Sequence, residues 1–155
     1  MLDSDNAAFI QTGVSISLAS CGPEHLPSMS RVLGCKLLDG GVQVCVFVRR
    51  SQSEALLDHI RDSGRVANVF SLPSSNRTVQ LKGNDARIFP FAMADLPIVD
   101  RHIADFILEV MPLGMPESVV RAILAFRPDD LASVVYTPCA AYSQTPGPKA
   151  GERLG

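Results

Sequence analysis

Apolar and polar positions alternate along much of the first 90 residues, which is the spacing of β-strands. The alternation is clearest over 14–19 and 42–48, and 27–38 also divides into two faces. In 42–48, apolar residues occupy nearly both faces, which indicates a strand buried on both sides. Asp39-Gly40-Gly41 precedes this segment and is typical of a hairpin turn. We therefore expect the first three strands to form an antiparallel meander.

The remaining patterns predict further strands and four helices. Helical spacing occurs over 3–12, 52–63, about 98–110 and about 119–124, and extended segments are expected at 66–70, 77–83, 84–91 and 131–137. Gly64 is placed to end the second helix, and Gly83 is placed to form a bulge. Residues 143–155, rich in Pro and Gly, are expected to form an extended tail.

The order of these elements indicates the architecture. Strands come in a run instead of alternating with helices, so the 155 residues are expected to form one mainly β domain of the α+β class. Closure into a small antiparallel, Greek-key-like barrel with peripheral helices would remove exposed sheet edges.

Polar chemistry concentrates where the valine-rich strand gives way to the second helix. Arg49 and Arg50 follow the strand, and Ser51 and Ser53 precede the helical pattern. Two cations, two hydroxyls and free backbone N–H groups at a helix N-terminus are a common anion site. Ser51 and Glu54 also fit a capping box, which would explain the same residues without a ligand. Both interpretations stay open at this point.

Composition excludes several classes of function. A formal net charge of −2 and few aromatic residues give no reason to expect nucleic-acid binding. No apolar run reaches the roughly 18–20 residues of a membrane helix. The N-terminus is acidic, unlike a signal peptide, so a cytoplasmic location and no membrane contact are expected.

The cysteines and histidines do not suggest a metal site. Their spacing contains neither C-x-x-C nor H-x-x-x-H, so no bound metal is expected. Reduced thiols in strands and surface histidines are the favoured interpretation. These residues are Cys21, Cys35, Cys45, Cys139, His25, His59 and His102.

Taken together, several of these segments resemble the pyridoxamine 5′-phosphate oxidase-like flavoproteins over about residues 8–90. The segments are Ser15-Ile16-Ser17-Leu18-Ala19-Ser20, Leu26-Pro27-Ser28, Val46-Phe47-Val48, Ser53-Glu54-Ala55-Leu56-Leu57 and Thr78-Val79-Gln80-Leu81-Lys82-Gly83. The resemblance implies a split β-barrel homodimer with FMN bound in two grooves at the subunit interface.

The resemblance also implies positions for the cofactor contacts. The flavin-contacting segment of the second strand falls on Ser30-Arg31-Val32-Leu33, and backbone groups of Phe47 and Val48 would meet the ring system. The phosphate-binding pair falls on Ser53 and Glu54. Thr78 and Gln80 would meet the flavin from a later strand and tune its ring.

Two departures from the family pattern affect the expected site. The oxidases have Arg in place of Ser30 and Arg-Lys in place of Ser53-Glu54. A carboxylate beside a phosphate dianion is unfavourable, so other cations must supply the charge. The candidates are Arg31, Arg49, Arg50 and Lys82, with Arg49 or Arg50 expected first, and Ser51 and Ser53 assisting.

The family's C-terminal Arg-x-His substrate motif is replaced here by Tyr136-Thr137-Pro138 and the Pro-Gly tail. Pyridoxal phosphate synthesis is therefore not expected. The favoured function is an FMN-dependent oxidoreductase of unassigned substrate, with no side chain singled out as acid or base. The alternatives are a non-catalytic split-barrel protein that binds haem, another ligand or no cofactor, and a dimerising scaffold.

Overall fold

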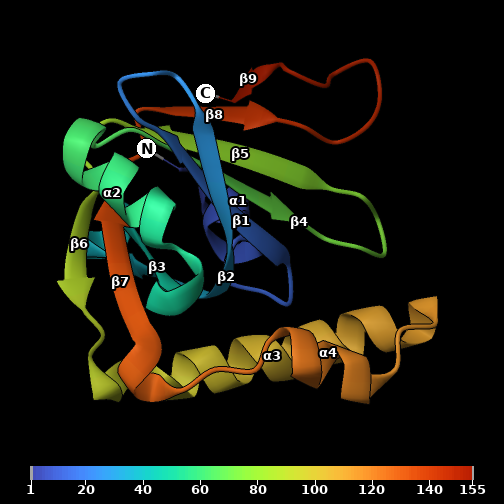
Figure 1. Ribbon diagram of the computed structural model, residues 1–155. Helices are drawn as coiled ribbons and strands as arrows, with labels where there is room; N and C mark the ends of the chain where they lie inside the picture. The colour runs from blue at the N-terminus through green and yellow to red at the C-terminus, as the bar shows by residue number, and fades with distance from the viewer. Residues whose placement is uncertain (1, 155) are drawn as a thin grey trace.

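Nine strands form one antiparallel sheet in the computed structural model, which describes residues 2–154 (Figure 1). Their order across the sheet is β6-β7-β3-β2-β1-β4-β5-β8-β9. The expected β1–β2–β3 meander and the α+β class are confirmed. The strands are β1 Ser15–Cys21, β2 Pro27–Leu38, β3 Gln43–Arg49, β4 Val66–Ser71, β5 Thr78–Gly83, β6 Arg87–Pro90, β7 Leu131–Tyr136, β8 Ala140–Ser143 and β9 Arg153–Leu154.

Within residues 2–154, four α-helices accompany the sheet. They are α1 Ser4–Phe9, α2 Glu54–Ser63, α3 Leu96–Val110 and α4 Glu117–Ile123. Figure 1 shows α3 and α4 together along one side of the sheet and α2 near β6 and β7. Gly64 ends α2 in the left-handed conformation, as the sequence predicts. None of the helices within residues 2–154 has the length and apolarity needed to span a bilayer.

Two apolar clusters hold these elements together. The first fills the inside of the curved sheet with alternate side chains of β1 to β5, and α2 adds Leu56, Leu57 and Ile60 to it. The second lies on the other side of β2 and β3, where α3 packs against Leu33 and Phe47. Strand β3 is therefore buried on both faces, which explains its nearly continuous apolar sequence.

The chain path after β5 differs from the expected continuation of the sheet past Gly83. Strand β6 instead pairs with β7 at the opposite edge of the sheet. Gly83 itself pairs regularly with Val66, so it forms no bulge. A Cβ at Gly83 would lie 2.6 Å from Cδ2 of Tyr136, which means that the glycine is needed for close packing against that ring.

The C-terminal segment also folds differently from the expected extended tail. Strand β8 adds to the edge of β5, and the short β9 pairs with β8 after a Pro-Gly loop. The N–H of Gly151 donates to the carbonyl oxygen of Ser143 at 2.7 Å and helps to close this loop. The segment 143–154 is thus docked on its own sheet.

His102 on α3 is buried, in contrast to the expected surface histidine. Only 7% of its surface is exposed, and it packs close to Gly34 of β2. Burial lowers the pKa of His102 to about 4 because the charged imidazolium would lose its hydration. The ring is therefore neutral at pH 7 and serves as part of the packing between α3 and the sheet.

Candidate functional site

Arg49, the last residue of β3, points its guanidinium into the protein. Its Nη1 donates to the carbonyl oxygens of Ile123 at 3.1 Å and Ala125 at 2.7 Å, at the end of α4. Its Nε is buried and has no hydrogen-bond partner among the described residues. Burial, and next the nearby charge of Arg31, lower the pKa of Arg49. Nη1 of this cation thus anchors the end of α4.

The turn just before α2 is bound by an internal carboxylate. Asp130 accepts hydrogen bonds from the N–H of Ser51 at 2.9 Å and from its hydroxyl at 2.5 Å. The N-cap of the helix is Ser53, whose buried hydroxyl has no partner within residues 2–154. The capping box of Ser51 and Glu54 therefore does not form. Asp130 and Glu54 place two negative charges near the point where the sequence suggested a phosphate.

The predicted residues of β2 and β3 are mostly interior. Ser30 is buried and donates its hydroxyl to the carbonyl oxygen of Gln52 at 3.1 Å. The side chains of Val32, Phe47 and Val48 are also buried. Arg31 is the exception: it is half-buried on the outer side of the sheet, where it donates to Oγ of Ser15 at 3.3 Å.

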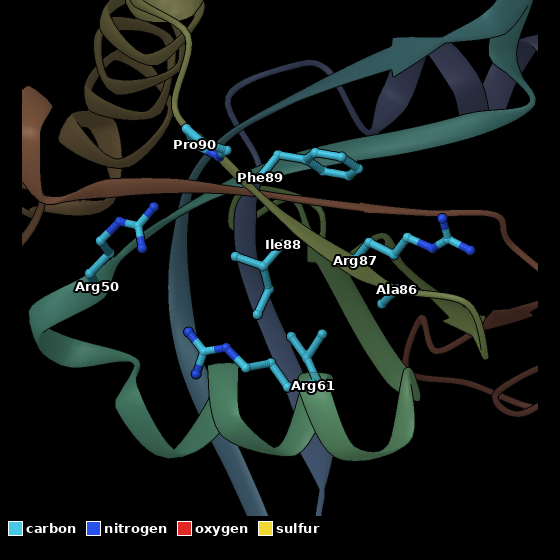
Figure 2. Close-up of a pocket in the computed structure, with 8 residues that line it drawn as sticks. Arg50, Arg61, Ala86, Arg87, Ile88, Phe89 and Pro90 are labelled. Carbon is cyan, nitrogen blue, oxygen red and sulfur yellow. The ribbon is translucent and has the colours of Figure 1, made fainter.

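Arg50, the residue after Arg49, contacts a different part of the protein. Its Nε donates to the carbonyl oxygen of Leu131 at 3.2 Å. The side chain lines a pocket between α2 and β6, where Arg61 and Arg87 also lie (Figure 2). The two adjacent arginines that the sequence suggested as one clamp therefore belong to different environments.

Arg31 belongs to a row of side chains that crosses four neighbouring strands. Direct cross-strand pairs join Arg31 to Ser17, Ser17 to Val69, and Val69 to Gln80. Directly paired residues project from the same face of a sheet. All four are half-buried, whereas the alternate residues of these strands fill the first apolar cluster.

This row and its neighbours form what we call the open sheet face. Its members are half-buried or exposed side chains of β1, β2, β4, β5 and β8, most of them small or polar. They are Ser15, Ser17, Ala19, Met29, Arg31, Ala67, Val69, Ser71, Thr78, Gln80, Lys82 and Tyr142.

One end of the open sheet face is hollowed. A pocket of about 360 Å³ lies there, with Ala19 and Ala67 on its floor and Lys82 beside it. Arg65 also lines the pocket, so its mostly small side chains are accompanied by two cations. A concave, largely apolar surface with a few polar groups is the usual form of a small-molecule site.

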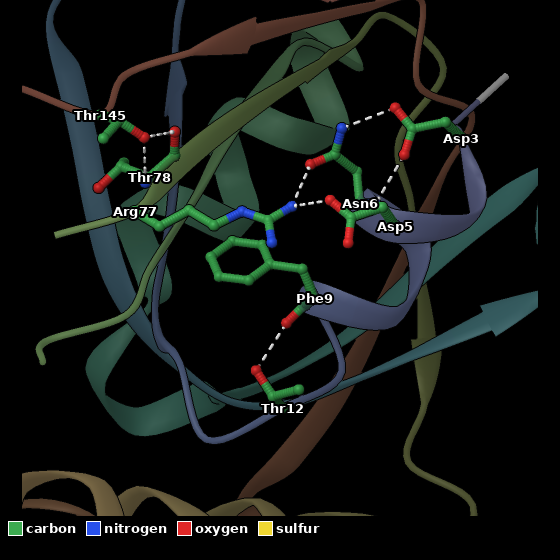
Figure 3. A network of polar contacts seen from close by, with 8 residues as sticks. All are labelled: Asp3, Asp5, Asn6, Phe9, Thr12, Arg77, Thr78 and Thr145. Carbon is green, nitrogen blue, oxygen red and sulfur yellow. Dashed lines mark hydrogen bonds and ion pairs between the residues drawn. The ribbon is translucent and has the colours of Figure 1, made fainter. Parts of the chain in front are cut away.

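Thr78 is held at the other end of the same face by two segments far apart in the sequence. Its N–H donates to Oγ1 of Thr145 at 2.9 Å, and its hydroxyl lies 2.8 Å from that of Ser71. The preceding Arg77 donates to Asp5 of α1 at 2.6 Å and lies over the ring of Phe9 (Figure 3). The C-terminal segment and α1 therefore fix the start of β5.

The structure thus divides the predicted residues among three environments. Arg31, Thr78, Gln80 and Lys82 come together on the open sheet face, Arg50 lies in the α2–β6 pocket, and the others are buried or paired internally. Arg61, Arg65, Arg87 and Asp130 were not singled out from the sequence. Asp130 contacts the distant Ser51, and the three arginines line pockets together with residues distant in the chain, so no local pattern signals them. Residues 2–154 contain no group of three or more His, Cys, Asp or Glu side chains placed to hold a metal ion.

Comparison with known proteins identifies the fold. No model of a known protein family matches the sequence, and no curated protein matches it. The structure is similar to HupZ of Group A Streptococcus, with a TM-score of 0.57 and 12% identity over 97% of this chain and 100% of that one. An F420 reductase gives a TM-score of 0.56 and 15% identity over 86% of this chain and 93% of that one.

A third similar structure is a pyridoxamine 5′-phosphate oxidase-related, FMN-binding protein of Nostoc punctiforme. Its TM-score is 0.50, with 11% identity over 88% of this chain and 77% of that one. The resemblance suggested by the sequence is confirmed in the fold.

Proposed function

We propose that this chain, which has the split-barrel fold of pyridoxamine 5′-phosphate oxidase-related proteins, is an FMN-binding oxidoreductase that acts on an unassigned substrate as a homodimer. The observation that carries the proposal is the open sheet face. On this face Arg31 and Gln80 lie near a hollow. Lys82 and mostly small, apolar side chains line that hollow. A similar structure with this fold is named as FMN-binding.

The donors on this face fit FMN better than those at the start of α2. A phosphate dianion next to Asp130 and Glu54 would be repelled, and Ser51 has no N–H left to offer because Asp130 accepts it. Arg31 makes a single 3.3 Å hydrogen bond to a neutral hydroxyl, so most of its donors remain for a phosphate. The guanidinium of Arg49, whose buried Nε has no partner among the described residues, lies near that of Arg31 and adds to the positive potential there.

Small side chains along β1 and β4 support the homodimer. Where the outer face of a packed sheet carries small side chains, as at β1 and β4, a second flat surface can approach it at close range. Ser17, Ala19 and Ala67 leave room for a planar ring or for the same strands of a second copy. A two-fold axis through this face would give two equivalent grooves between the subunits.

When bound, FMN would supply the redox chemistry, and the chain's own residues would hold and tune it. Arg31 would bind the phosphate. Gln80 and Lys82 are polar groups of the right kind to hydrogen-bond the ring system or the ribityl chain. The small floor of the hollow would exclude water from one side of the ring.

Titration of the purified protein with FMN, followed by flavin fluorescence, tests this proposal. We expect saturable binding and, for Arg31→Gln, a Kd raised on the order of tenfold, since a hydrogen bond to a charged group is worth about 1.5–3 kcal/mol. Arg121→Gln removes an exposed arginine that is paired to Glu117 and should leave the affinity unchanged.

A protein that ignores FMN would overturn the proposal. If haem then gave a Soret band, the alternative of a non-catalytic binding protein would replace it. Unaltered affinity in Arg31→Gln would show that the phosphate is held elsewhere.

A further inference from the structure

Three arginines from separate elements line the pocket between α2 and β6. Arg50 follows β3, Arg61 lies on α2 and Arg87 begins β6, around a pocket of about 420 Å³. Figure 2 shows the guanidinium groups of Arg50 and Arg61 on the same side of Ile88, while Arg87 extends toward the other end of β6. In a chain whose net charge is −2, three cations at one pocket are a strong local concentration.

These cations are incompletely neutralised. Arg50 donates its Nε to a backbone carbonyl, and its terminal nitrogens have no protein partner among residues 2–154. Arg61 pairs with Asp58, but both side chains are more than half exposed, so this ion pair is weak and easily exchanged.

The neighbouring carboxylates are directed elsewhere. Asp130 is held by Ser51, and Asp85 accepts the N–H of Thr137 at 2.8 Å. Both carboxylates keep their negative charge, but neither lines the pocket, and the three charged side chains that do line it are arginines.

Apolar side chains complete the pocket. Ile60, Ile88 and the half-exposed Phe89 also line it, and Figure 2 shows Ile88 between Arg61 and Arg87. A ligand that fits this lining has an oxyanion head and a small apolar body. We propose that the pocket binds a small phosphate monoester with an apolar or aromatic body. The monoester carries about −1.5 to −2 charges at pH 7, and planar guanidinium groups bind its oxygens in pairs.

This site is distinct from the proposed flavin site. Its lining residues come from α2, β6 and the end of β3, whereas the open sheet face belongs to β1, β2, β4, β5 and β8. No lining residue is shared between the two. Because FMN is itself a phosphate monoester, the experiment must separate the two sites.

Phenyl phosphate is a suitable probe, followed by calorimetry and by amide NMR shifts in the FMN-saturated protein. We expect saturable binding with shifts at Ala86 and Ile88, weaker binding of inorganic phosphate, and a Kd for Arg61→Gln/Arg87→Gln raised by on the order of tenfold or more. Arg121→Gln is the matched control, because this helical arginine also pairs with a carboxylate of its own helix. The FMN affinity should be the same in all of these variants.

Three results would overturn the proposal. The first is the absence of saturable binding, and the second is unchanged affinity in the double variant. The third is displacement of phenyl phosphate by FMN, which would make the pocket part of the flavin site. If FMN fails to bind at all, the calorimetry with phenyl phosphate is run on the protein without FMN. Its result then tests the pocket independently of the proposed function.

Discussion

Lowering the pH should destabilise the protein through His102. The pKa of this buried imidazole is about 4 in the folded protein, against an ordinary value of 6.5. Below pH 6.5 the imidazole is protonated in the unfolded chain but stays neutral in the folded protein down to about pH 4. The free energy of unfolding therefore falls as the pH falls. The linkage relation gives a loss of about 2 kcal/mol between pH 7 and pH 5 and about 3 kcal/mol by pH 4.

Urea unfolding at pH 7 and pH 5 measures this loss, with His102→Gln as the comparison. The substitution removes the titrating group but keeps a polar side chain, so any constant cost of the change cancels in the difference between the two pH values. We expect the wild type to lose about 2 kcal/mol more than the variant over this range. Equal losses would show that His102 is hydrated in the folded protein and would refute its burial against β2.

Two further predictions concern the packing of the strands. Gly83→Ala should cost about 1–3 kcal/mol of unfolding free energy in a thermal or urea melt, because the new methyl group would overlap the ring of Tyr136; a wild-type stability would show that this ring moves freely. Cys21 and Cys139 should react rapidly with an aromatic disulfide reagent in the folded protein, whereas the other two cysteines, whose thiol pKa values are raised by burial, should react only on unfolding. Rapid labelling of all four would contradict the burial of β2 and β3.

Much of the fold follows from local signals in the sequence. The alternation in β1 and β3, the hairpin at Asp39-Gly40-Gly41 and the stop at Gly64 each depend on residues that are neighbours in the chain. Residues 84–91 were expected to continue the sheet past Gly83; β6 does form there as part of the sheet, but it pairs with β7 at the other edge. Such pairing brings together segments that are distant in the sequence, and the local pattern of an edge strand does not predict which strand it pairs with.

The site shows the same division between local and distant information. Sequence spacing placed Gln80 and Lys82 on one face of β5, and the structure sets Arg31 on that same face through β1 and β4. The hydrogen bonds of Arg49 could not be predicted from the sequence, because the carbonyl groups that accept them lie some 75 residues further along the chain. The contact of Asp130 with Ser51 could not be predicted either, since the two residues are separated in the sequence by α2, α3, α4 and several strands.

Native mass spectrometry of the protein mixed with FMN tests the central claim most directly. The open sheet face, with Arg31 and Lys82 near a hollow of small side chains, predicts a dimer that carries two FMN molecules and, at the same FMN concentration, a lower FMN occupancy in Arg31→Gln. A monomer without FMN, at concentrations where the folded protein is intact, would contradict it.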